Sequence, residues 1–371
     1  MRILFAAGGT GGHLFPALAV ARELQVRAPE TEVLFAGTRS GIEASAVPKA
    51  GFQMAHISIY GLKRALALSN LILPFVMLTS IGQSCSIVRR FAPNIVFGTG
   101  GYVTAPVLVA ALLNGIPTML HEQNSRPGLT TRWLSKWVSL VLLSFAKSEV
   151  YFRRKNNLRI TGNPTRLQPR TSHPQSAREF FGLNTDRYTV LIFGGSLGAH
   201  SINAAVLDAL SELLSKGLVQ LLWQTGKRDF EWISDCTREY GDRVRVHPFI
   251  DDMADAYRAA DVILCRAGAT TLAEITSLGC SAILVPYPYA TGGHQEINAR
   301  MLVEEGAAEM ILDRELRGQT LAAAIIDLLE NPSKRKRMRE KCRAMGRPQA
   351  VTDIIETMFQ LLHSRRGHVD S

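Results

Sequence analysis

The first residues that could carry out chemistry form the run Gly8-Gly9-Thr10-Gly11-Gly12-His13. It follows a short apolar segment, and glycines at such a point let backbone N–H groups approach an oxygen-rich ligand. An imidazole has an ordinary pKa of about 6.5, so His13 can accept a hydroxyl proton at neutral pH and is a candidate general base. A histidine that merely bonds to the backbone at a helix start fits the same pattern, so both interpretations stay open.

A second run of the same kind lies in the other half of the chain. Leu4 to His13 resembles Leu191 to His200, since each has an apolar segment, a glycine turn with a hydroxyl residue and a histidine. Neither turn is a GxGxxG, and the segment after the first one ends in Gly37 where a dinucleotide site needs an acid. No GxxxxGK[ST] occurs either. NAD binding is therefore disfavoured, and a P-loop is excluded.

Further polar clusters are predicted to follow strands. They are Gly98–Gly101, His121–Asn124, Arg266–Glu274, and Gly292–Gln295 with Asn298. A carboxylate such as Glu274, soon after a helix start that could hold a diphosphate, is suited to ribose hydroxyls. The sequence has no Asp-x-Asp, so a metal clamp on a nucleotide sugar is not expected, and no cofactor is predicted. Helix N-termini, with Arg166 or Arg266, would then meet the charge of a leaving diphosphate.

These clusters need an α/β scaffold, and the apolar pattern supplies one. Strands are expected at Ile3–Ala7, Glu32–Ala36, Ile95–Phe97, Thr118–His121, Thr189–Phe193, Val219–Gln224, Val244–Val246, Val262–Cys265 and Ala282–Val285. Helices are expected at Phe15–Val26 and at about 201–215, and a last one near 352–363. Such alternation predicts parallel sheets covered by helices. The proline-rich segment Thr161–Pro174 reads as a linker between two such domains that face a cleft.

The charge of the chain is concentrated in its first part. The net charge is +10, but residues 1–165 hold 17 Lys and Arg against 6 Glu, and the remainder is close to neutral. A basic half predicts an anionic partner: a membrane surface, nucleic acid or a phosphorylated substrate. Solubility alone is the other interpretation. The 5 cysteines are widely spaced, which indicates neither a disulfide framework nor a zinc site.

An uncharged apolar stretch, residues 65–88, raises the question of a membrane. It contains Asn70, Pro74, Gln83 and several serines, so an interfacial or partly buried apolar helix is favoured over a transmembrane one. Lys63, Arg64, Arg89 and Arg90 bracket it, as an interfacial anchor on acidic lipid requires. With this bracket, a membrane surface is preferred to nucleic acid as the anionic partner.

Taken together, the motifs resemble one family along nearly the whole chain. They are Gly8–His13, Gly98–Tyr102, His121–Asn124, Thr161–Arg166, Gly194–Ser196, Phe249–Met253, Cys265–Ala269 and His294-Gln295. In this order they are similar to the MurG family, the lipid I N-acetylglucosaminyltransferases of peptidoglycan synthesis. The resemblance implies an α/β GT-B fold with domains at 1–165 (acceptor and membrane) and 166–345 (UDP-N-acetylglucosamine), and a helix at 346–371 on a domain surface.

The resemblance also implies the reaction and its residues. An inverting hexosyltransferase would move N-acetylglucosamine from its UDP donor to the C4 hydroxyl of undecaprenyl-diphospho-muramoylpentapeptide (lipid I), giving lipid II for the cell wall. His13 would be the base, with Glu122 the second choice. Ile250 would meet the uracil through its backbone, Glu274 the ribose and Gln295 the sugar hydroxyls. The full donor set implied is Thr10, Gly11, Gly12, Asn124, Arg166, Ser196, Ile250, Ala269, Thr270, Thr271, Leu272, Ala273, Glu274 and Gln295.

Departures from the family pattern put fine contacts in doubt but not the reaction class. They occur at Leu197, His200, Ser125, Arg126 and Gly293. Rival functions are a UDP-N-acetylglucosamine 2-epimerase, a transferase of the same fold with another lipid or natural-product acceptor, and a non-catalytic scaffold that binds a nucleotide sugar. The expected location is the cytoplasmic side of the plasma membrane, peripherally bound, with other cell-wall synthesis proteins as partners.

Overall fold

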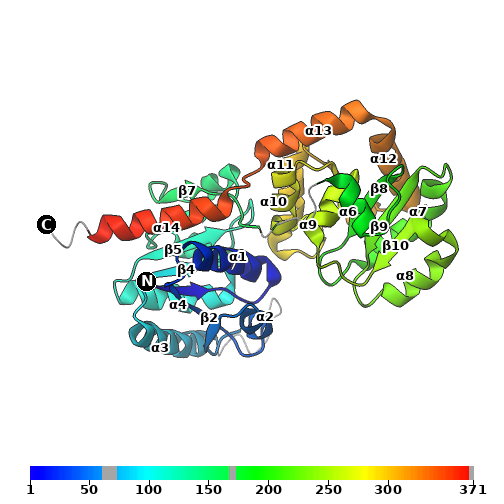
Figure 1. Ribbon diagram of the computed structural model, residues 1–371. Coiled ribbons are helices and arrows are strands. Elements are labelled where there is room, and N and C mark those ends of the chain that lie inside the picture. Colours follow the sequence, from blue (N-terminus) through cyan, green and yellow to red (C-terminus); the bar gives the residue numbers. More distant parts are fainter. Residues whose placement is uncertain (61–72, 166, 168–172, 367–371) are drawn as a thin grey trace. The chain divides into compact units, whose positions relative to one another are not determined.

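The computed structural model describes residues 1–60, 73–165, 167 and 173–366 of the chain (Figure 1). Its contacts divide the chain into two compact units. The first unit combines Met1–Thr165 with Arg347–Ser371, and the second unit is Arg166–Gly346. The chain therefore passes from one unit to the other twice, at residues 165–166 and at 346–347.

A seven-stranded parallel sheet forms the centre of the first unit, in the order β3-β2-β1-β4-β5-β6-β7. Its strands are β1 (Arg2–Ala6), β2 (Glu32–Gly37), β3 (Gln53–His56), β4 (Ile95–Gly98), β5 (Thr118–Glu122), β6 (Leu140–Leu143) and β7 (Leu158–Ile160). The middle strands are apolar at consecutive positions because helices cover both of their faces.

The two faces of this sheet have separate cores. Phe5, Phe35 and Phe97 pack with α1 (Gly11–Arg27) on one face, and Leu4, Val96 and Leu120 pack on the other. The helices of the second face are α3 (Leu73–Phe91), α4 (Gly101–Leu113) and α5 (Leu129–Leu134), while α2 (Glu43–Lys49) adjoins β3. A 3-10 turn, Ala146–Tyr151, follows β6.

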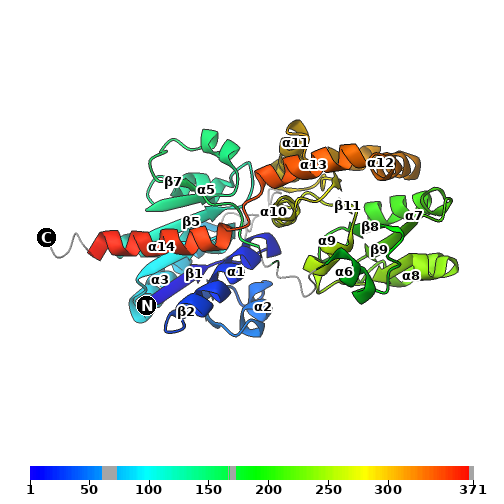
Figure 2. The ribbon, with the colours of Figure 1, turned by 45° about the horizontal axis from the view of Figure 1, so that its top comes forward.

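The last helix of the chain, α14 (Ala350–Arg366), belongs to the first unit. It lies beside α1 along the sheet, as the two ribbon views agree (Figures 1 and 2). Ile354, Ile355 and Met358 are fully buried there, in the same core as Ile3 and Phe5. The apolar residues that predicted a helix near 352–363 thus form the face that packs α14 onto the first unit.

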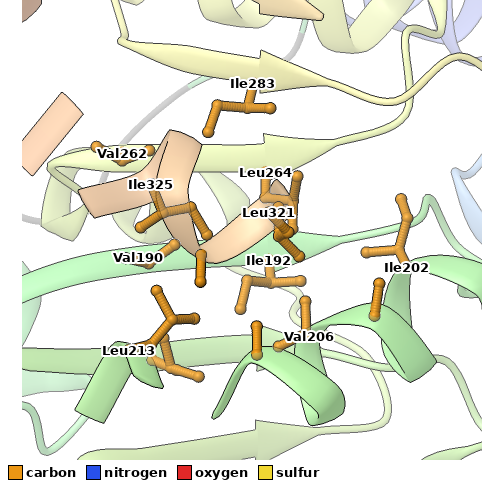
Figure 3. Close-up of a cluster of buried hydrophobic side chains, with 14 of the residues drawn as sticks. Val190, Ile192, Ile202, Val206, Leu213, Val262, Leu264, Ile283, Leu321 and Ile325 are labelled. Atoms are coloured by element: carbon orange, nitrogen blue, oxygen red, sulfur yellow. The ribbon is translucent and has the colours of Figure 1, made fainter. Parts of the chain in front are cut away.

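The second unit holds a six-stranded parallel sheet in the order β10-β9-β8-β11-β12-β13. The strands are β8 (Tyr188–Phe193), β9 (Val219–Gln224), β10 (Val244–His247), β11 (Val262–Cys265), β12 (Ala282–Leu284) and β13 (Glu309–Met310). Its helices are α6 (Pro174–Phe180), α7 (His200–Leu214), α8 (Phe230–Thr237), α9 (Met253–Ala259), α10 (Ala269–Leu278), α11 (His294–Glu304), α12 (Gly318–Glu330) and α13 (Pro332–Met345). Figure 3 shows side chains of α7 and α12 packed over those of β8 and β11.

The alternation predicted from the sequence is confirmed, with two differences. Helix α1 begins at Gly11 rather than at Phe15, because the N–H groups of His13 and Leu14 already bond to Thr10 O. Glycine has low helix propensity, so the pattern placed the start too late. Strands β3, β6, β7 and β13 have two to four residues, too few to show a period, and were not predicted.

No helix in the described part of the chain is long and apolar enough to cross a membrane. The uncharged stretch 65–88 falls partly outside this part. Residues 65–72 are among those not described, and the remainder lies in α3.

Candidate functional site

His13 lies where the order of the first sheet reverses. Strand β1 pairs with β2 on one side and with β4 on the other, so the loops after β1 and β4 leave the sheet in opposite directions. Ligands of open α/β sheets bind at such a point, beyond the carboxyl ends of the strands. Thr10 is the N-cap of α1, and Gly11, Gly12 and His13 form its first turn. The N–H groups of Gly11 and Gly12, which have no acceptor within the helix, can meet an anion or a sugar oxygen, whereas that of His13 bonds to Thr10 O.

Two glycines after β4 make room for the imidazole of His13. Gly100 and Gly101 have φ angles of 96° and 77°, which L side chains rarely adopt. A Cβ at Gly100 would lie 2.9 Å from Nδ1 of His13, and one at Gly101 would lie 2.6 Å from the carbonyl oxygen of Gly8. The Gly98–Tyr102 motif therefore serves to bring the β4 loop against the β1 loop and the histidine.

Hydrogen bonds hold His13 on two sides. Its Nδ1 lies 2.9 Å from Oε1 of Gln123, and its carbonyl oxygen accepts a bond of 2.7 Å from the hydroxyl of Thr99. The ring is partly exposed, so Nε2 can still meet a ligand. His13 is therefore positioned as a general base needs to be.

The loop after β5 carries Asn124, which lies next to Gln123. Glu122 shapes this loop, because its buried carboxylate accepts bonds from the N–H groups of Asn124 and Gly128 and from the side chain of Asn124. Through these contacts Glu122 stabilises the loop. They leave it less suited than His13 to take a substrate proton, although it was the second candidate.

A buried carboxylate that the sequence did not single out fixes the glycine loop. Glu43 of α2 is fully buried, and it accepts a 3.0 Å bond from the N–H of Gly9 as well as bonds from Thr38 N and Oγ1. Burial raises the pKa of Glu43, but the bonds from Thr38 and Gly9 outweigh this and lower it below the usual value. A Cβ at Gly8 or Gly41 would lie within 2.6 Å of this carboxyl group.

The second unit repeats this plan at its own reversal point, between β8 and β11. The loop Gly194–Ala199 leads from β8 into α7 and exposes Ser196. Gly198 has a φ of 78°, and a Cβ there would lie 2.0 Å from the carbonyl oxygen of Thr225. Only glycine fits this contact, which holds the loop against the end of β9.

Two hydrogen bonds near this loop involve residues that the sequence singled out. The N–H of Ile250 donates to Oε1 of Gln224 at 2.8 Å, so a uracil would have to use the carbonyl of Ile250 or displace Gln224. His200, one of the departures from the family pattern, bonds through Nδ1 to Asp229 at 3.0 Å.

Helix α10 opens directly after β11 and its loop. Ala269, Thr270 and Thr271 form its first turn, followed by Leu272, Ala273 and Glu274. The hydroxyl of Thr270 is buried without a hydrogen-bond partner among the described residues. A buried unsatisfied hydroxyl is costly, so it is suited to a ligand oxygen at this helix start. Leu272 and Ala273 are buried and contribute backbone rather than side chain.

Glu274 is held by a tyrosine. The hydroxyl of Tyr257, on α9, donates a 2.7 Å bond to Oε2 of Glu274. Burial raises the pKa of Glu274 to about 7, although the bond from Tyr257 lowers it. One carboxylate oxygen of Glu274 is thus fixed by a hydrogen bond.

Two arginines were expected to meet a diphosphate, and the structure describes only Arg266. Arg266 is nearly buried and is paired with Asp313, and it also donates to Ser201 and to the carbonyls of Val285 and Pro286. Arg266 thus uses both of its terminal nitrogens inside the second unit, and its role toward a leaving group stays a prediction. Arg166, the other candidate, lies outside the described residues.

Gln295 is the second residue of α11, and its Oε1 accepts a 2.9 Å bond from the N–H of Tyr287. Within the described ranges, no cluster of His, Cys, Asp and Glu could hold a metal ion. Each unit therefore offers helix N-termini, hydroxyls and a carboxylate or an imidazole as its polar groups.

Known proteins share this arrangement. Residues 3–143 match the glycosyltransferase family 28 N-terminal domain, and residues 189–357 match its C-terminal domain. A UDP-N-acetylglucosamine–N-acetylmuramyl-(pentapeptide) pyrophosphoryl-undecaprenol N-acetylglucosamine transferase of Thermodesulfovibrio yellowstonii is 43% identical over 99% of this chain and 100% of its own length. The protein of the same name from Prosthecochloris aestuarii is 44% identical over 95% of this chain and 97% of its own. The chain belongs to the MurG family.

A solved structure agrees with this membership. MurG from Acinetobacter baumannii superposes with a TM-score of 0.76 at 30% identity and covers 97% of this chain and 99% of its own. The chain is thus a glycosyltransferase of the GT-B fold. A putative UDP-N-acetylglucosamine 2-epimerase from Listeria monocytogenes has a TM-score of 0.69 but only 12% identity, so it shares the fold alone. The rival epimerase activity is not favoured.

The sequence did not indicate the roles of three residues of the site. Gln123 stands inside a quoted motif, so only its role was missed, and its position beside His121 could have suggested it. Tyr257 and Glu43 carry no local signal, because their partners are 17 and 34 residues away along the chain.

Proposed function

We propose that this MurG-family transferase moves N-acetylglucosamine from UDP-N-acetylglucosamine to the C4 hydroxyl of the muramoyl residue of lipid I, with inversion, and so makes lipid II. The observation that carries this proposal is the identity of 43% over whole chains with a transferase whose name states both donor and acceptor. His13 at the reversal point of the first sheet, and Glu274 at that of the second, are what such a reaction needs.

In this proposal the second unit holds the donor. The start of α10 and the unpartnered hydroxyl of Thr270 would meet the diphosphate, while Glu274 would accept bonds from the ribose. The backbone carbonyl of Ile250 would meet the uracil, and Gln295 the sugar hydroxyls. Ser196 and Asn124 stay candidates for the phosphate and the sugar. As UDP leaves, dipoles fixed in advance stabilise its new charge without a metal.

The first unit would hold the acceptor. The C4 oxygen attacks the anomeric carbon from the face opposite UDP, the new C–O bond forms as the bond to phosphate breaks, and the hydroxyl proton passes to the imidazole of His13. Thr10, Gly11 and Gly12 would orient the reacting groups through the first turn of α1. Orientation and proton transfer are the two contributions that these residues can make.

An apolar patch supports peripheral membrane binding by the first unit. Phe75 and Leu78 of α3 are 71% and 66% exposed, and Leu129 and Trp133 of α5 are 76% and 51% exposed. A groove of about 430 Å³ between α3, α4 and α5 is lined by Met77, Ile81, Ala105, Val109, Leu129, Thr130 and Trp133. Exposed patches of this kind mark interaction sites.

Charge at the other end of α3 favours an anionic bilayer as the partner of the patch. Arg89 and Arg90 are exposed at the end of α3, whereas Lys63 and Arg64, the other two residues of the expected bracket, lie outside the described residues. Apolar side chains that insert next to arginines bind acidic lipid surfaces. We therefore place the enzyme on the cytoplasmic face of the plasma membrane.

Transfer of labelled N-acetylglucosamine to purified lipid I tests the function. We expect His13→Ala to lower kcat by about 10²–10⁴-fold, the usual contribution of a general base. His363→Ala on the exposed side of α14 is the matched control and should act like the parent. Activity of His13→Ala within a few-fold of the parent would remove His13 from the base role. Conversion of the donor to the manno sugar without acceptor would identify an epimerase.

Binding to vesicles tests the membrane proposal. Phe75→Ser with Leu78→Ser should weaken sedimentation with phosphatidylglycerol vesicles, as should added salt, because salt screens the arginines. Val26→Ser is the control, since Val26 is 75% exposed on α1, which covers the opposite face of the sheet. Equal binding by the double variant and the control would contradict the assignment of the patch.

A further inference from the structure

A row of four groups links the proposed base to the backbone of the first unit. Nδ1 of His13 lies 2.9 Å from Oε1 of Gln123, and Nε2 of Gln123 lies 3.0 Å from Nδ1 of His121. Nε2 of His121 lies 2.9 Å from the carbonyl oxygen of Gly162. Gln123 and His121 are buried, so solvent does not compete for these bonds.

Backbone carbonyls determine which way each group in the row points. Nε2 of Gln123 also lies 2.8 Å from the carbonyl oxygen of Thr99, and a carbonyl oxygen can only accept. The amide nitrogen must therefore face Thr99, and the amide oxygen must face His13. The reversed amide would bring two acceptors together at 2.8 Å.

The same reasoning fixes the protons of both histidines. The carbonyl of Gly162 requires a proton on Nε2 of His121, so Nδ1 of that ring is free to accept from Gln123. Burial lowers the pKa of His121 to about 4, and the ring is therefore neutral at physiological pH. Oε1 of Gln123 accepts only, so Nδ1 of His13 must be the donor.

From this we infer that Gln123 and His121 are positioning residues that hold His13 in the tautomer with its proton on Nδ1. The lone pair of Nε2 then faces outward, ready to take a proton. This inference rests on the proposed role of His13 as the base. A histidine tautomer is commonly set by the bond that the other ring nitrogen makes, and here an amide takes the place of the more usual carboxylate.

The far end of the row is rigid. Gly162 has a φ of 85°, and a Cβ there would lie 2.4 Å from the Cβ of Arg347 and 3.2 Å from that of Ala350. The Cα of Gly162 is therefore packed against the segment that leads into α14. The orientation of His13 thus depends on a backbone contact between residues far apart in the sequence.

The tautomer can be observed without an activity measurement. The chain has 9 histidines, and in protein with ¹⁵N-labelled histidine the signals of His13 are those lost in His13→Ala. We expect the parent to show a protonated Nδ1 and an unprotonated Nε2 at His13 near neutral pH. A protonated Nε2 would overturn the inference, and no variant of Gln123 has to fold for this result.

Substitution of Gln123 tests its effect on the rate. Gln123→Met keeps the length of the side chain but neither accepts nor donates, so both tautomers of His13 should appear and kcat should fall by about 10–100-fold, within the general-base contribution. Gln123→Glu should restore much of both, since one oxygen can accept from His13 while a protonated one donates to Thr99. His121→Phe should act more weakly, because Thr99 still orients Gln123.

Gln220→Met is the matched control. Gln220 is a buried glutamine of the second unit with three hydrogen bonds of its own, and its loss should affect stability without changing the His13 signals. An unchanged tautomer and an unchanged kcat in Gln123→Met would refute the inference. If His13→Ala stays active while Gln123→Met still changes the tautomer, the base role fails and the positioning by Gln123 stands.

Discussion

Removal of one hydroxyl from the second unit should shift the pH dependence of donor binding to higher pH. Tyr257 is buried, its hydroxyl donates to Oε2 of Glu274, and its ring packs edge-on against Phe193 with centroids 5.8 Å apart. Tyr257→Phe keeps the ring contact and removes only the hydrogen bond. Because that bond lowers the pKa of Glu274, its loss should raise this pKa above its present value of about 7.

The size of the effect follows from the charge on Glu274. A hydrogen bond to a charged group contributes about 1.5–3 kcal/mol, and we take the lower value. That value corresponds to a tenfold change in proton affinity, or about one pH unit. Only the carboxylate can accept both ribose hydroxyls, so KM for the donor should rise as pH falls through 7. In Tyr257→Phe the same rise should begin about one pH unit higher, which gives a KM increase of about threefold at pH 7.5.

Steady-state kinetics between pH 6 and 9 would measure this shift, with donor varied and acceptor saturating. Glu274→Gln is the control, because a neutral amide should give a donor KM that is higher but independent of pH in this range. Tyr257→Phe should add little in that background, as a double-mutant cycle would show. A Tyr257→Phe profile that coincides with the parent, or that is raised equally at every pH, would refute the reasoning.

Three other predictions concern the scaffold of the site. Glu43→Gln places an NH₂ against the N–H groups that the carboxylate now binds. Relative to the parent, kcat should fall and the unfolding free energy should drop by about 1–3 kcal/mol. An unaltered kcat would show that Glu43 does not control the catalytic geometry of the glycine loop. Gly198→Ala should weaken UDP binding in calorimetry at least tenfold, because its Cβ meets the Thr225 carbonyl, and parent-like affinity would contradict this. Ile354→Ala should cost the first unit about 2–5 kcal/mol, seen as faster amide exchange in β1, and should leave exchange in β8 unchanged.

Much of the fold could be predicted because its strong elements are local. Buried parallel strands such as Val262–Cys265 are continuous apolar runs, and their alternation with helices restricts the topology to a parallel sheet. The short strands β7 and β13 could not be found in this way, since they are strands only because a neighbour pairs with them. The start of α1 was misplaced for a related reason, because a glycine turn has little propensity of its own.

For the site, too, local motifs could be predicted and contacts between distant residues could not. Motifs within a few residues, such as Gly8–His13 and Ala269–Glu274, indicated where ligands would bind, and the structure places each of them after a strand at the reversal point of its sheet. Sequence reasoning could not reveal that Arg266 pairs with Asp313, because this partner lies 47 residues away along the chain. Charge alone cannot distinguish an arginine that binds a ligand from one that stabilises a loop.

The sequence by itself determined the family, the reaction class and the residue types available, because these depend on the order of short motifs along the chain. Only the tertiary structure decided what each polar group faces. His13 is oriented by Gln123, which is 110 residues away, and Gly162, in turn, holds His121. Hydrogen bonds depend on distance and direction in space, and a sheet brings the ends of distant strands together, so the proton on Nδ1 of His13 is a property of the folded chain.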